Sequence, residues 1–293
     1  MIRSISQTIS LGGLLKKEPS SSTSNDKLEK IITQLESDIL NGSWIDKNYS
    51  DMDVKLMPAL VMQANNKFPE MNLNFVTSPE DLSIEVKNTI DSGVESSRFI
   101  VNMGQDGVHF GVIDYKRIEE KNSLILFEPA RLFNTQSMGP AMLAIRAKRA
   151  IEFYEGLTNC HFSVVEMDIQ RSSSECGIFS LALAKKLYIE RDDLKKIHED
   201  NVGGKLNYNE MPLPHDKLDP YLPATFYKHT QGAGRLDEYL NANQQRANTI
   251  VNKKNETLSH RFNNNQLTTK YGKKMSISAH KKRVSEYKKL LKP

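Results

Sequence analysis

The chain has 293 residues, 38% of them hydrophobic, which is enough to build a sizeable core in one large domain or two modest ones. Two cysteines cannot form a disulfide framework and lack the CxxC spacing of a zinc site, so a reducing environment is expected. No apolar run approaches the roughly 18 residues of a membrane span, and the opening MIRSISQTIS lacks the apolar core of a secretory signal peptide.

The net charge of +4 is unevenly distributed along the chain. Residues 224–293 carry 15 Lys and Arg against 4 Asp and Glu, whereas the remaining residues carry 25 against 32. This basic C-terminal segment predicts an internal clamp or a polyanion site, and a solvated basic tail is the alternative. The aromatic residues are dispersed, unlike those that stack single-stranded nucleic acid, so no nucleic-acid partner is expected.

The predicted elements mix helices with strands. The Ser-rich, aperiodic residues 1–25 predict a flexible segment, and Asn25 or Asp26 caps a helix that ends at Asn41-Gly42. Further helices are predicted over about 50–66, 80–91 and 138–155, after Cys176, and at the basic C-terminus. Strands are predicted over 72–78, 97–103, 108–115, 123–129 and 160–170. Without a strict βαβ repeat, this order indicates an α+β fold.

Cys176 begins an apolar helix in the stretch QRSSSECGIFSLALA. The N-terminus of a helix carries partial positive charge and free N–H groups, which stabilise a thiolate. A small buried cysteine is nevertheless the commoner case. A nucleophile also needs a base, and the base needs an acid that orients it.

The predicted hairpin 108–128 supplies such a pair. Its polar connection is centred between Ile118 and Glu119, a register that places His109 directly opposite Glu128. Opposed residues have Cβ atoms about 5 Å apart, so the imidazole and the carboxylate can form a hydrogen bond. A slip by one residue would separate them onto opposite faces, and an incidental polar pair is the alternative. The same register sets Phe110 against Phe127, Val112 against Ile125 and Ile113 against Leu124.

Gln170 is expected at the end of a strand, six residues before Cys176. From there its side-chain amide could reach the helix N-terminus and, with the N–H of the nucleophile, stabilise a developing oxyanion. The order His, Glu, Gln and Cys-Gly is more specific than any one residue, and it predicts a cysteine nucleophile that forms an acyl intermediate.

Several stretches carry a family resemblance: VHFGVIDY, LILFEPA, TQSMGPAMLAIRAKRA, CHFSVVEMDIQRSSSECGIFSLALAKKLYIERD, LPHDKLDPYLP and FYKHTQG. They make the chain resemble the YopJ family of type III secreted effector acetyltransferases, while the order of the triad is similar to that of ubiquitin-like-protein proteases. The resemblance implies an α+β, cysteine-protease-like catalytic core of the ubiquitin-like-protein protease type. It also implies a helical, basic regulatory region built from the C-terminal segment and the N-terminal helices.

The family resemblance further implies the chemistry. Cys176 would take an acetyl group from acetyl-CoA, with His109 as the base oriented by Glu128, and pass it to a Ser, Thr or Lys of a host kinase. The implied targets are MAP kinase kinases and the IκB kinase, reached after type III secretion into the host-cell cytoplasm, and the implied activator is inositol hexakisphosphate. The expected organisation is a secretion segment, a catalytic domain and a regulatory segment, over 1–25, 26–223 and 224–293.

Ligand contacts follow from these expectations. Coenzyme A is expected near His109, the loop Arg171-Ser172, and Lys185 and Lys186, which lie about 14–15 Å along the helix; exposed helix lysines are the alternative. Six phosphates need cations that converge from distant segments, and the candidates are Arg98, Lys228, His229, Lys281, Lys282 and Arg283.

Two other functions stay open at this point. A cysteine protease acting on ubiquitin-like conjugates would use the same triad, and mass spectrometry of an acetylated Cys176 would distinguish it. A binding module without catalysis would keep its activity in Cys176→Ala. No metal site is expected, because His198, His215, His260 and His280 have no partner at ligand spacing, and Cys160 is interpreted as structural.

Overall fold

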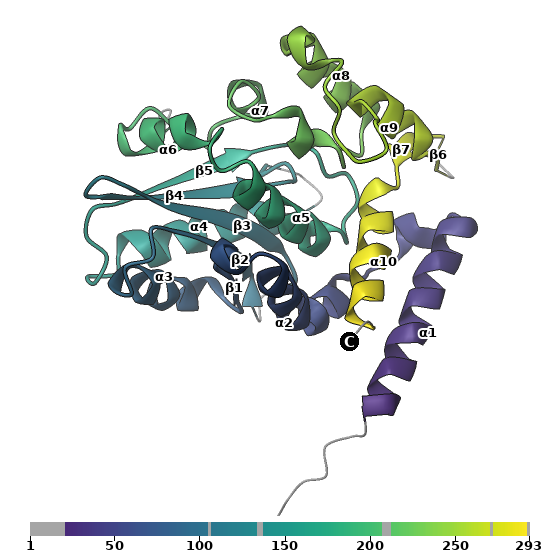
Figure 1. Ribbon diagram of the computed structural model, residues 1–293, viewed down its shortest axis with the longest axis horizontal. Coiled ribbons are helices and arrows are strands. Elements are labelled where there is room, and N and C mark those ends of the chain that lie inside the picture. The colour runs from purple at the N-terminus through teal and green to yellow at the C-terminus, as the bar shows by residue number, and fades with distance from the viewer. Residues whose placement is uncertain (1–20, 105–106, 134–136, 207–211, 270–271, 292–293) are drawn as a thin grey trace, which may run out of the picture.

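The computed structural model describes residues 21–104, 107–133, 137–206, 212–269 and 272–291 (Figure 1). A five-stranded mixed sheet in the order β1-β2-β3-β4-β5 forms its centre. The outer pairs β1–β2 and β4–β5 are parallel, and the inner pairs are antiparallel. The strands are β1 (Leu73–Val76), β2 (Ser96–Asn102), β3 (Phe110–Ile118), β4 (Lys121–Glu128) and β5 (Cys160–Glu166).

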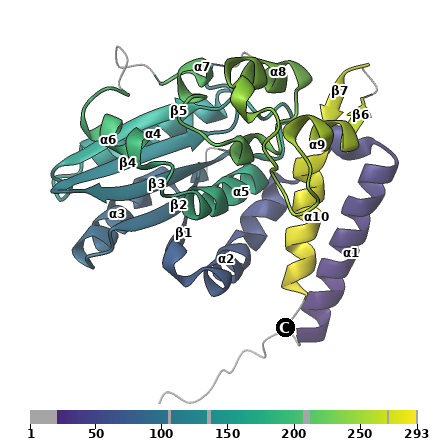
Figure 2. The same ribbon diagram turned by 45° about the horizontal axis from the view of Figure 1, so that its top comes forward.

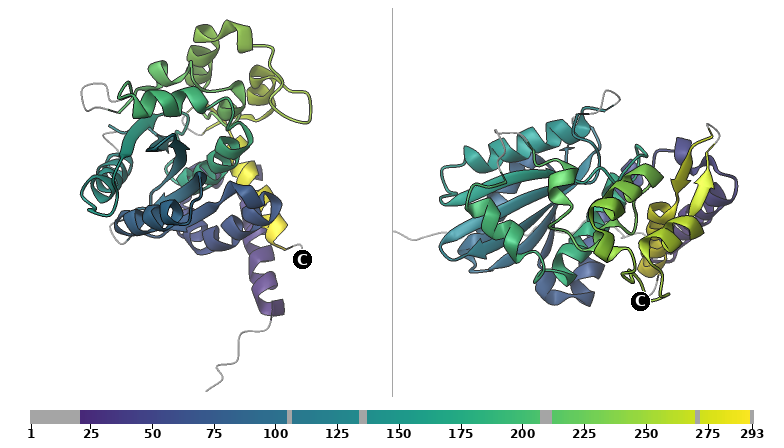
Figure 3. Two further views of the ribbon diagram at one scale, coloured as in Figure 1. Left: turned by 60° about the vertical axis from the view of Figure 1, so that its left-hand side comes forward. Right: turned by 90° about the horizontal axis from the view of Figure 1, so that it is seen from above.

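Helices cover both faces of this sheet (Figure 3). Leu143 of α4 and Val86 of α3 pack on one face with Leu126, and Phe179 of α5 packs on the other with Phe110. Burial on both faces explains the short apolar runs FGVI at the start of β3 and LILF near the end of β4. The helices are α1 (Ser21–Leu40), α2 (Ser50–Lys67), α3 (Leu82–Asp91), α4 (Gly139–Glu152), α5 (Cys176–Ile189), α6 (Lys195–Val202), α7 (His215–Leu218), α8 (Ala233–Ala242), α9 (Leu258–Asn264) and α10 (Ser278–Leu290).

The C-terminal segment closes back on the N-terminal helices. A short hairpin of β6 (Gln266–Thr268) and β7 (Lys274–Ser276) precedes α10, which lies beside α1 and also packs on α2 and α5 (Figure 2). His280 of α10 is fully buried and contacts the Leu35 carbonyl of α1. Within the described residues, the C-terminal helix of the basic segment is thus packed against the N-terminal helices.

The β3–β4 hairpin has a different register from the one expected. Val112 pairs with Phe127 and Ile118 with Lys121, a shift of two residues, because the chain reverses tightly at Glu119 in the left-handed region. The predicted pairing of His109 directly with Glu128 is therefore wrong. An even shift preserves the faces, so the two residues remain diagonal neighbours on one side of the sheet.

Two further boundaries differ from the expected ones. α1 begins at Ser21, several residues before Asn25, so the end of the predicted flexible segment 1–25 is helical; its first 20 residues lie outside the described part. β5 ends at Glu166, and Asp168 adopts a left-handed conformation (φ 54°) that terminates the strand. Gln170 consequently lies in a loop beyond the strand. Whether 26–223 and 224–293 act as separate units stays a prediction.

Candidate active site

Cys176 is the first residue of α5 and is completely buried. The loop that follows β5 delivers it to the end of the sheet, where β3 begins and β4 ends. Cys176 therefore lies in the first turn of the helix, where backbone N–H groups have no intrahelical acceptor. The sequence places the thiol at this terminus because the apolar helix core begins only after Gly177.

His109 and Glu128 form the pair that the sequence predicts, despite the register shift. His109 Nε2 lies 2.8 Å from Glu128 Oε2, and Cys176 is within hydrogen-bonding reach of the same imidazole. Burial lowers the pKa of His109, but Glu128 and Cys176 outweigh it and raise that pKa to about 10. The other oxygen of Glu128 accepts a hydrogen bond from the Ala130 N–H at 2.9 Å, which fixes the carboxylate.

Two glycines make room for this pair. A Cβ on Gly111 would lie 2.8 Å from Leu126 Cδ1 and 3.9 Å from Glu128 Oε2. Gly139, at the start of α4, lies so close that its Cβ would approach the His109 Cβ to 3.2 Å. Gly139 thus leaves room for the His109 side chain, and Gly111 leaves room for the leucines that pack beside Glu128.

Gln170 lies beside the nucleophile's loop. Its side-chain Nε2 donates to the Ser172 carbonyl at 2.7 Å, and its backbone N–H donates to Pro129 O. An amide nitrogen carries two donors, so one remains after the bond to Ser172. The residue is 6% exposed and lines the pocket described next.

A pocket of about 900 Å³ opens on the His109 side of the catalytic residues. Its lining includes His109, Arg171 and Ser172, three of the predicted coenzyme A contacts, and also Gln170. Arg171 is held by the Asp168 carboxylate at 2.5 Å, so its guanidinium is fixed at the rim. The pocket also contains cations that the sequence reasoning missed: Arg131, Lys273 and Lys274.

Lys185 and Lys186 do not line this pocket. Lys185 Nζ contacts Glu286 Oε2 of α10 at 2.8 Å, and Lys186 Nζ contacts Glu190 Oε1 at 3.1 Å. The sequence predicts that both lysines meet the coenzyme A phosphates, but the structure turns these side chains toward α10 and the end of α5, outside the pocket that His109 lines. Burial lowers the pKa of Lys185 to about 8 in spite of Glu286.

Lys228 lies instead at the centre of a basic cluster. Burial and the charges of Lys186, Lys282 and Arg261 lower its pKa to about 7. Arg261 Nε donates to the Lys228 carbonyl at 2.8 Å, which joins α9 to this position. We call these four residues the Lys228 cluster; they come from α5, the segment before α8, α9 and α10.

The comparisons with known proteins agree with this arrangement. A family model described as YopJ Serine/Threonine acetyltransferase matches residues 28–289. The chain belongs to the YopJ serine/threonine acetyltransferase family. It is 69% identical over 100% of both chains to the serine/threonine-protein acetyltransferase YopJ of Yersinia pestis, and equally similar to that of Yersinia pseudotuberculosis.

Solved YopJ-like folds match as well. The structure of AvrA delL154 with IP6 and CoA has a TM-score of 0.86 at 55% identity and covers 92% of this chain and 99% of its own. The structure of HopZ1a with IP6 and CoA has a TM-score of 0.70 at 17% identity, over 92% and 97% of the two chains. These matches confirm the predicted α+β fold class.

Within this YopJ-family chain, two predicted polyphosphate contacts are wrong. Arg98 is 1% exposed and pairs with Asp114 Oδ1 at 2.8 Å across β2 and β3. Arg283 exposes no surface and pairs with Asp53. Both guanidinium groups are held by buried carboxylates and cannot turn toward a surface ligand.

The other predicted polyphosphate residues lie near the Lys228 cluster. His229 is buried, and burial together with Lys228 and Arg261 lowers its pKa well below the usual value. Its Nδ1 bonds Ser278 Oγ at 3.1 Å, while Nε2 is buried without a partner among the described residues. Lys281 is exposed and contacts Asn265 Oδ1. Sequence reasoning missed Arg261, whose only signal was its place in the basic segment.

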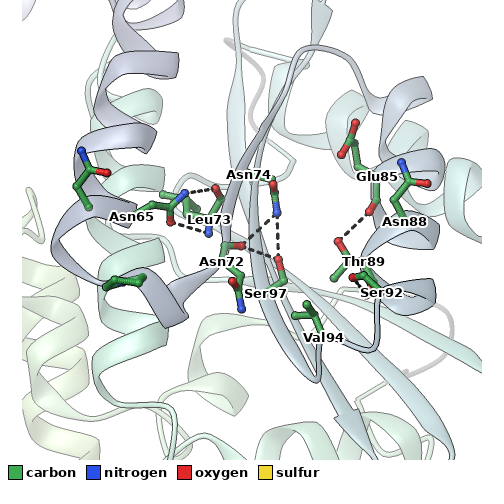
Figure 4. A pocket seen from close by; sticks show the side chains of 12 residues that line it. Asn65, Asn72, Leu73, Asn74, Glu85, Asn88, Thr89, Ser92, Val94 and Ser97 are labelled. Carbon is green, nitrogen blue, oxygen red and sulfur yellow. Dashed lines mark hydrogen bonds between the residues drawn. The ribbon is translucent and has the colours of Figure 1, made fainter.

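A second pocket, of about 780 Å³, lies far from this chemistry, beside the edge strand β1 (Figure 4). Asn65 bonds both the N–H and the carbonyl of Leu73, and Asn74 bonds Ser97 Oγ, so these amides mainly satisfy the strand edge. The lining of this second pocket contains no His or Cys, and we assign the pocket no catalytic role. In the part of the chain that the structure describes, no group of side chains could hold a metal ion, and no helix is both long and apolar enough to cross a membrane.

Proposed function

We propose that this family member transfers acetyl groups through Cys176. The observation that carries the proposal is the buried His109–Glu128 pair within reach of that thiol. His109 takes the thiol proton, and the thiolate attacks the acetyl-CoA carbonyl, so that an S-acetyl bond forms as the thiol of coenzyme A leaves with a proton. His109 then takes the proton of an acceptor hydroxyl, which attacks the acetyl-cysteine and releases Cys176.

Gln170 and the N–H of Cys176 would stabilise the oxyanion of both steps. Support for this role is the position of Gln170 on the pocket wall and its unused amide donor. The bond to the Ser172 carbonyl would hold the amide plane while the second N–H faces the reacting carbonyl.

Acetyl-CoA would occupy the pocket beside His109. A coenzyme with three phosphates needs cations at the rim, and Arg171, Lys273, Lys274 and Arg131 fulfil this requirement better than Lys185 and Lys186. The coenzyme present in the AvrA and HopZ1a structures supports the same ligand here.

Inositol hexakisphosphate would bind at the Lys228 cluster and activate the enzyme. Burial and three neighbouring cations disfavour the charged form of Lys228, and a polyphosphate would relieve the repulsion. The cluster joins α5, α9 and α10, so an anion bound there would favour the state in which α10 is docked. The IP6 present in the AvrA and HopZ1a structures supports a polyphosphate as the ligand.

The acceptors we propose are Ser and Thr residues, and in some cases Lys, in the activation loops of host MAP kinase kinases and the IκB kinase. Acetylation there would block phosphorylation and silence MAPK and NF-κB signalling. The protein would act in the host-cell cytoplasm after type III secretion. The support is the full-length similarity to YopJ.

The test is incubation with labelled acetyl-CoA and a MAP kinase kinase, with and without inositol hexakisphosphate, followed by intact mass and peptide mapping. We expect one acetyl group on Cys176 and label on Ser or Thr of the kinase, both dependent on the polyphosphate. The matched control is Cys160→Ala, since burial raises the pKa of that thiol to about 11 and leaves it unreactive. Label transfer by Cys176→Ala, or cleavage of a ubiquitin-like conjugate instead, would overturn the proposal.

A further inference from the structure

Arg283 of α10 reaches the loop that carries the nucleophile. Its Nε and Nη2 each lie 3.0 Å from an oxygen of Asp53 in α2, and Nη2 also donates to the Ser174 carbonyl at 2.6 Å. Nη1 lies 3.7 Å from Glu175 Oε1, and the guanidinium stacks 4.9 Å from the Tyr49 ring. One side chain therefore joins two helices to the two residues directly before Cys176.

The same loop is held on its other side by Gln231. Its Oε1 accepts the Ser172 N–H at 2.9 Å, and its Nε2 donates to Glu175 Oε2. Glu175 Oε2 also accepts the Ser172 hydroxyl at 2.6 Å. Since Gln231 secures Oε2 while Oε1 faces Arg283, the orientation of Glu175 depends on both residues.

Two buried carboxylates meet at this point, at the first turn of α5. Asp53 is 1% exposed, and its Oδ2 lies so near Gly177 that a Cβ there would approach it to 2.8 Å. Glu175 is equally buried. Without a cation between them, the two carboxylates would repel each other. This repulsion would displace Cys176, which lies between Glu175 and Gly177 in the sequence.

We propose that Arg283 is a positioning residue that fixes Cys176 against His109, so that docking of the C-terminal helix completes the catalytic centre. The inference rests on Cys176 being the nucleophile of the proposed function. A guanidinium suits the role because its planar fork bonds Asp53, Ser174 and Glu175 at once, whereas an ammonium on a lysine stem reaches one of them.

The alternative is that the buried Arg283–Asp53 ion pair only stabilises the fold. A substitution of Tyr287 distinguishes this structural role from the positioning role. Tyr287 lies one turn further along α10, and its hydroxyl donates to the same Asp53 Oδ1 at 2.5 Å. Its hydroxyl bond leads to α2 and not to the loop before Cys176. Tyr287→Phe should therefore lower stability without moving the thiol.

The experiment measures alkylation of Cys176 by iodoacetamide in full-length protein carrying Cys160→Ser, with acetyl transfer assayed alongside. We expect Arg283→Lys to slow alkylation about tenfold. We expect its kcat to fall about 10²-fold while the KM for acetyl-CoA stays within about twofold. Tyr287→Phe should lower the Tm yet alkylate at the wild-type rate.

Equal alkylation rates in Arg283→Lys and wild type, or equal slowing in Tyr287→Phe, would overturn the proposal. If Arg283→Lys does not fold, Asp53→Asn takes its place, because it preserves the shape of the side chain that Arg283 binds. Asp53→Asn should slow alkylation of Cys176 severalfold, and an unchanged alkylation rate would contradict the proposal. Alkylation needs no acetyl-CoA. Arg283-dependent alkylation in a protein without acetyl transfer would therefore refute the proposed function and leave this inference standing.

Discussion

The charge of Glu128 controls the protonation of His109. Burial alone would keep this imidazole neutral, and the carboxylate 2.8 Å away reverses that preference. Because its pKa is raised from the ordinary 6.5 to about 10, protonated His109 stabilises the fold fully below about pH 6.5. That stabilisation is lost as the pH rises toward 10.

Glu128→Gln should therefore shift the titration of His109 to lower pH, since burial is then opposed only by Cys176. Acetyl transfer should fall about 10²–10⁴-fold, because the neutral glutamine neither orients the imidazole as firmly nor favours its protonated form. NMR titration of the His109 ring and kinetics would measure the two effects. Glu166→Gln, at the paired position of β5, is the matched control and should leave the His109 titration unchanged. An unaltered titration in Glu128→Gln would contradict the assignment.

Gly177 is required by the close approach of Asp53. A methyl group at Gly177 would lie 2.8 Å from Asp53 Oδ2, so Gly177→Ala should reduce the free energy of unfolding by about 1–3 kcal/mol. Gly234→Ala is the control, because its Cβ would meet no atom within 4 Å in α8 and should stabilise by up to about 1 kcal/mol. Urea denaturation measures the free energy of unfolding of both variants. Similar values for the two would show that Asp53 moves aside at little energetic cost.

At the scale of elements, α5, α9 and α10 are brought together around cations that repel one another. Burial and three positive neighbours depress the pKa of Lys228 to about 7. Lys228 therefore lowers the free energy of unfolding of the ligand-free protein, and this effect is complete below about pH 7. The destabilisation disappears as the pH rises toward 10.5. Such a residue is expected where binding, and not stability, governs the choice of side chain.

Lys228→Met should raise the Tm of the ligand-free protein, and more at pH 6 than at pH 10. It should also abolish the increase in Tm that inositol hexakisphosphate gives the wild type. Thermal melts at both pH values, with and without the polyphosphate, test this. Lys288→Met, which removes an exposed pair with Glu36, is the control and should leave both properties nearly unchanged. A lower Tm in ligand-free Lys228→Met than in wild type would show that the charge of Lys228 does not destabilise the folded protein.

Across the whole molecule, α10 holds the N-terminal helices and the catalytic loop in place. It contributes Arg283 to the buried carboxylates, and Val284 and Tyr287 to the main core. Breaking a buried ion pair by removing one partner costs about 3–5 kcal/mol, a large share of the roughly 5–15 kcal/mol that stabilises a typical domain.

A chain that stops at Ile277 should therefore lose its cooperative thermal transition and its near-ultraviolet circular dichroism. Lys288→Ala in the full chain provides the comparison, since an exposed pair contributes less than about 1 kcal/mol. A truncated protein that still unfolds cooperatively near the wild-type temperature would show that α10 is an accessory element.

The catalytic residues could be predicted because short-range patterns place them. The cysteine stands where an apolar helix begins, and His109 and Glu128 flank a hairpin. The predicted register was wrong by two residues, yet the pair survived, because side chains on a strand alternate with a period of two. Side-chain length then closed the remaining diagonal distance.

The destinations of the cations could not be predicted in this way. Arg283 and Lys282 are neighbours in the sequence, but one is buried against Asp53 and the other joins the Lys228 cluster. Arg283 and Asp53 are 230 positions apart, so no local period relates them. The sequence by itself determined which residues carry the chemistry, through helix ends and strand alternation. Only the packing of α10 against α2 and α5 decided which charges face inward, since a buried cation must lie where a carboxylate from another segment meets it.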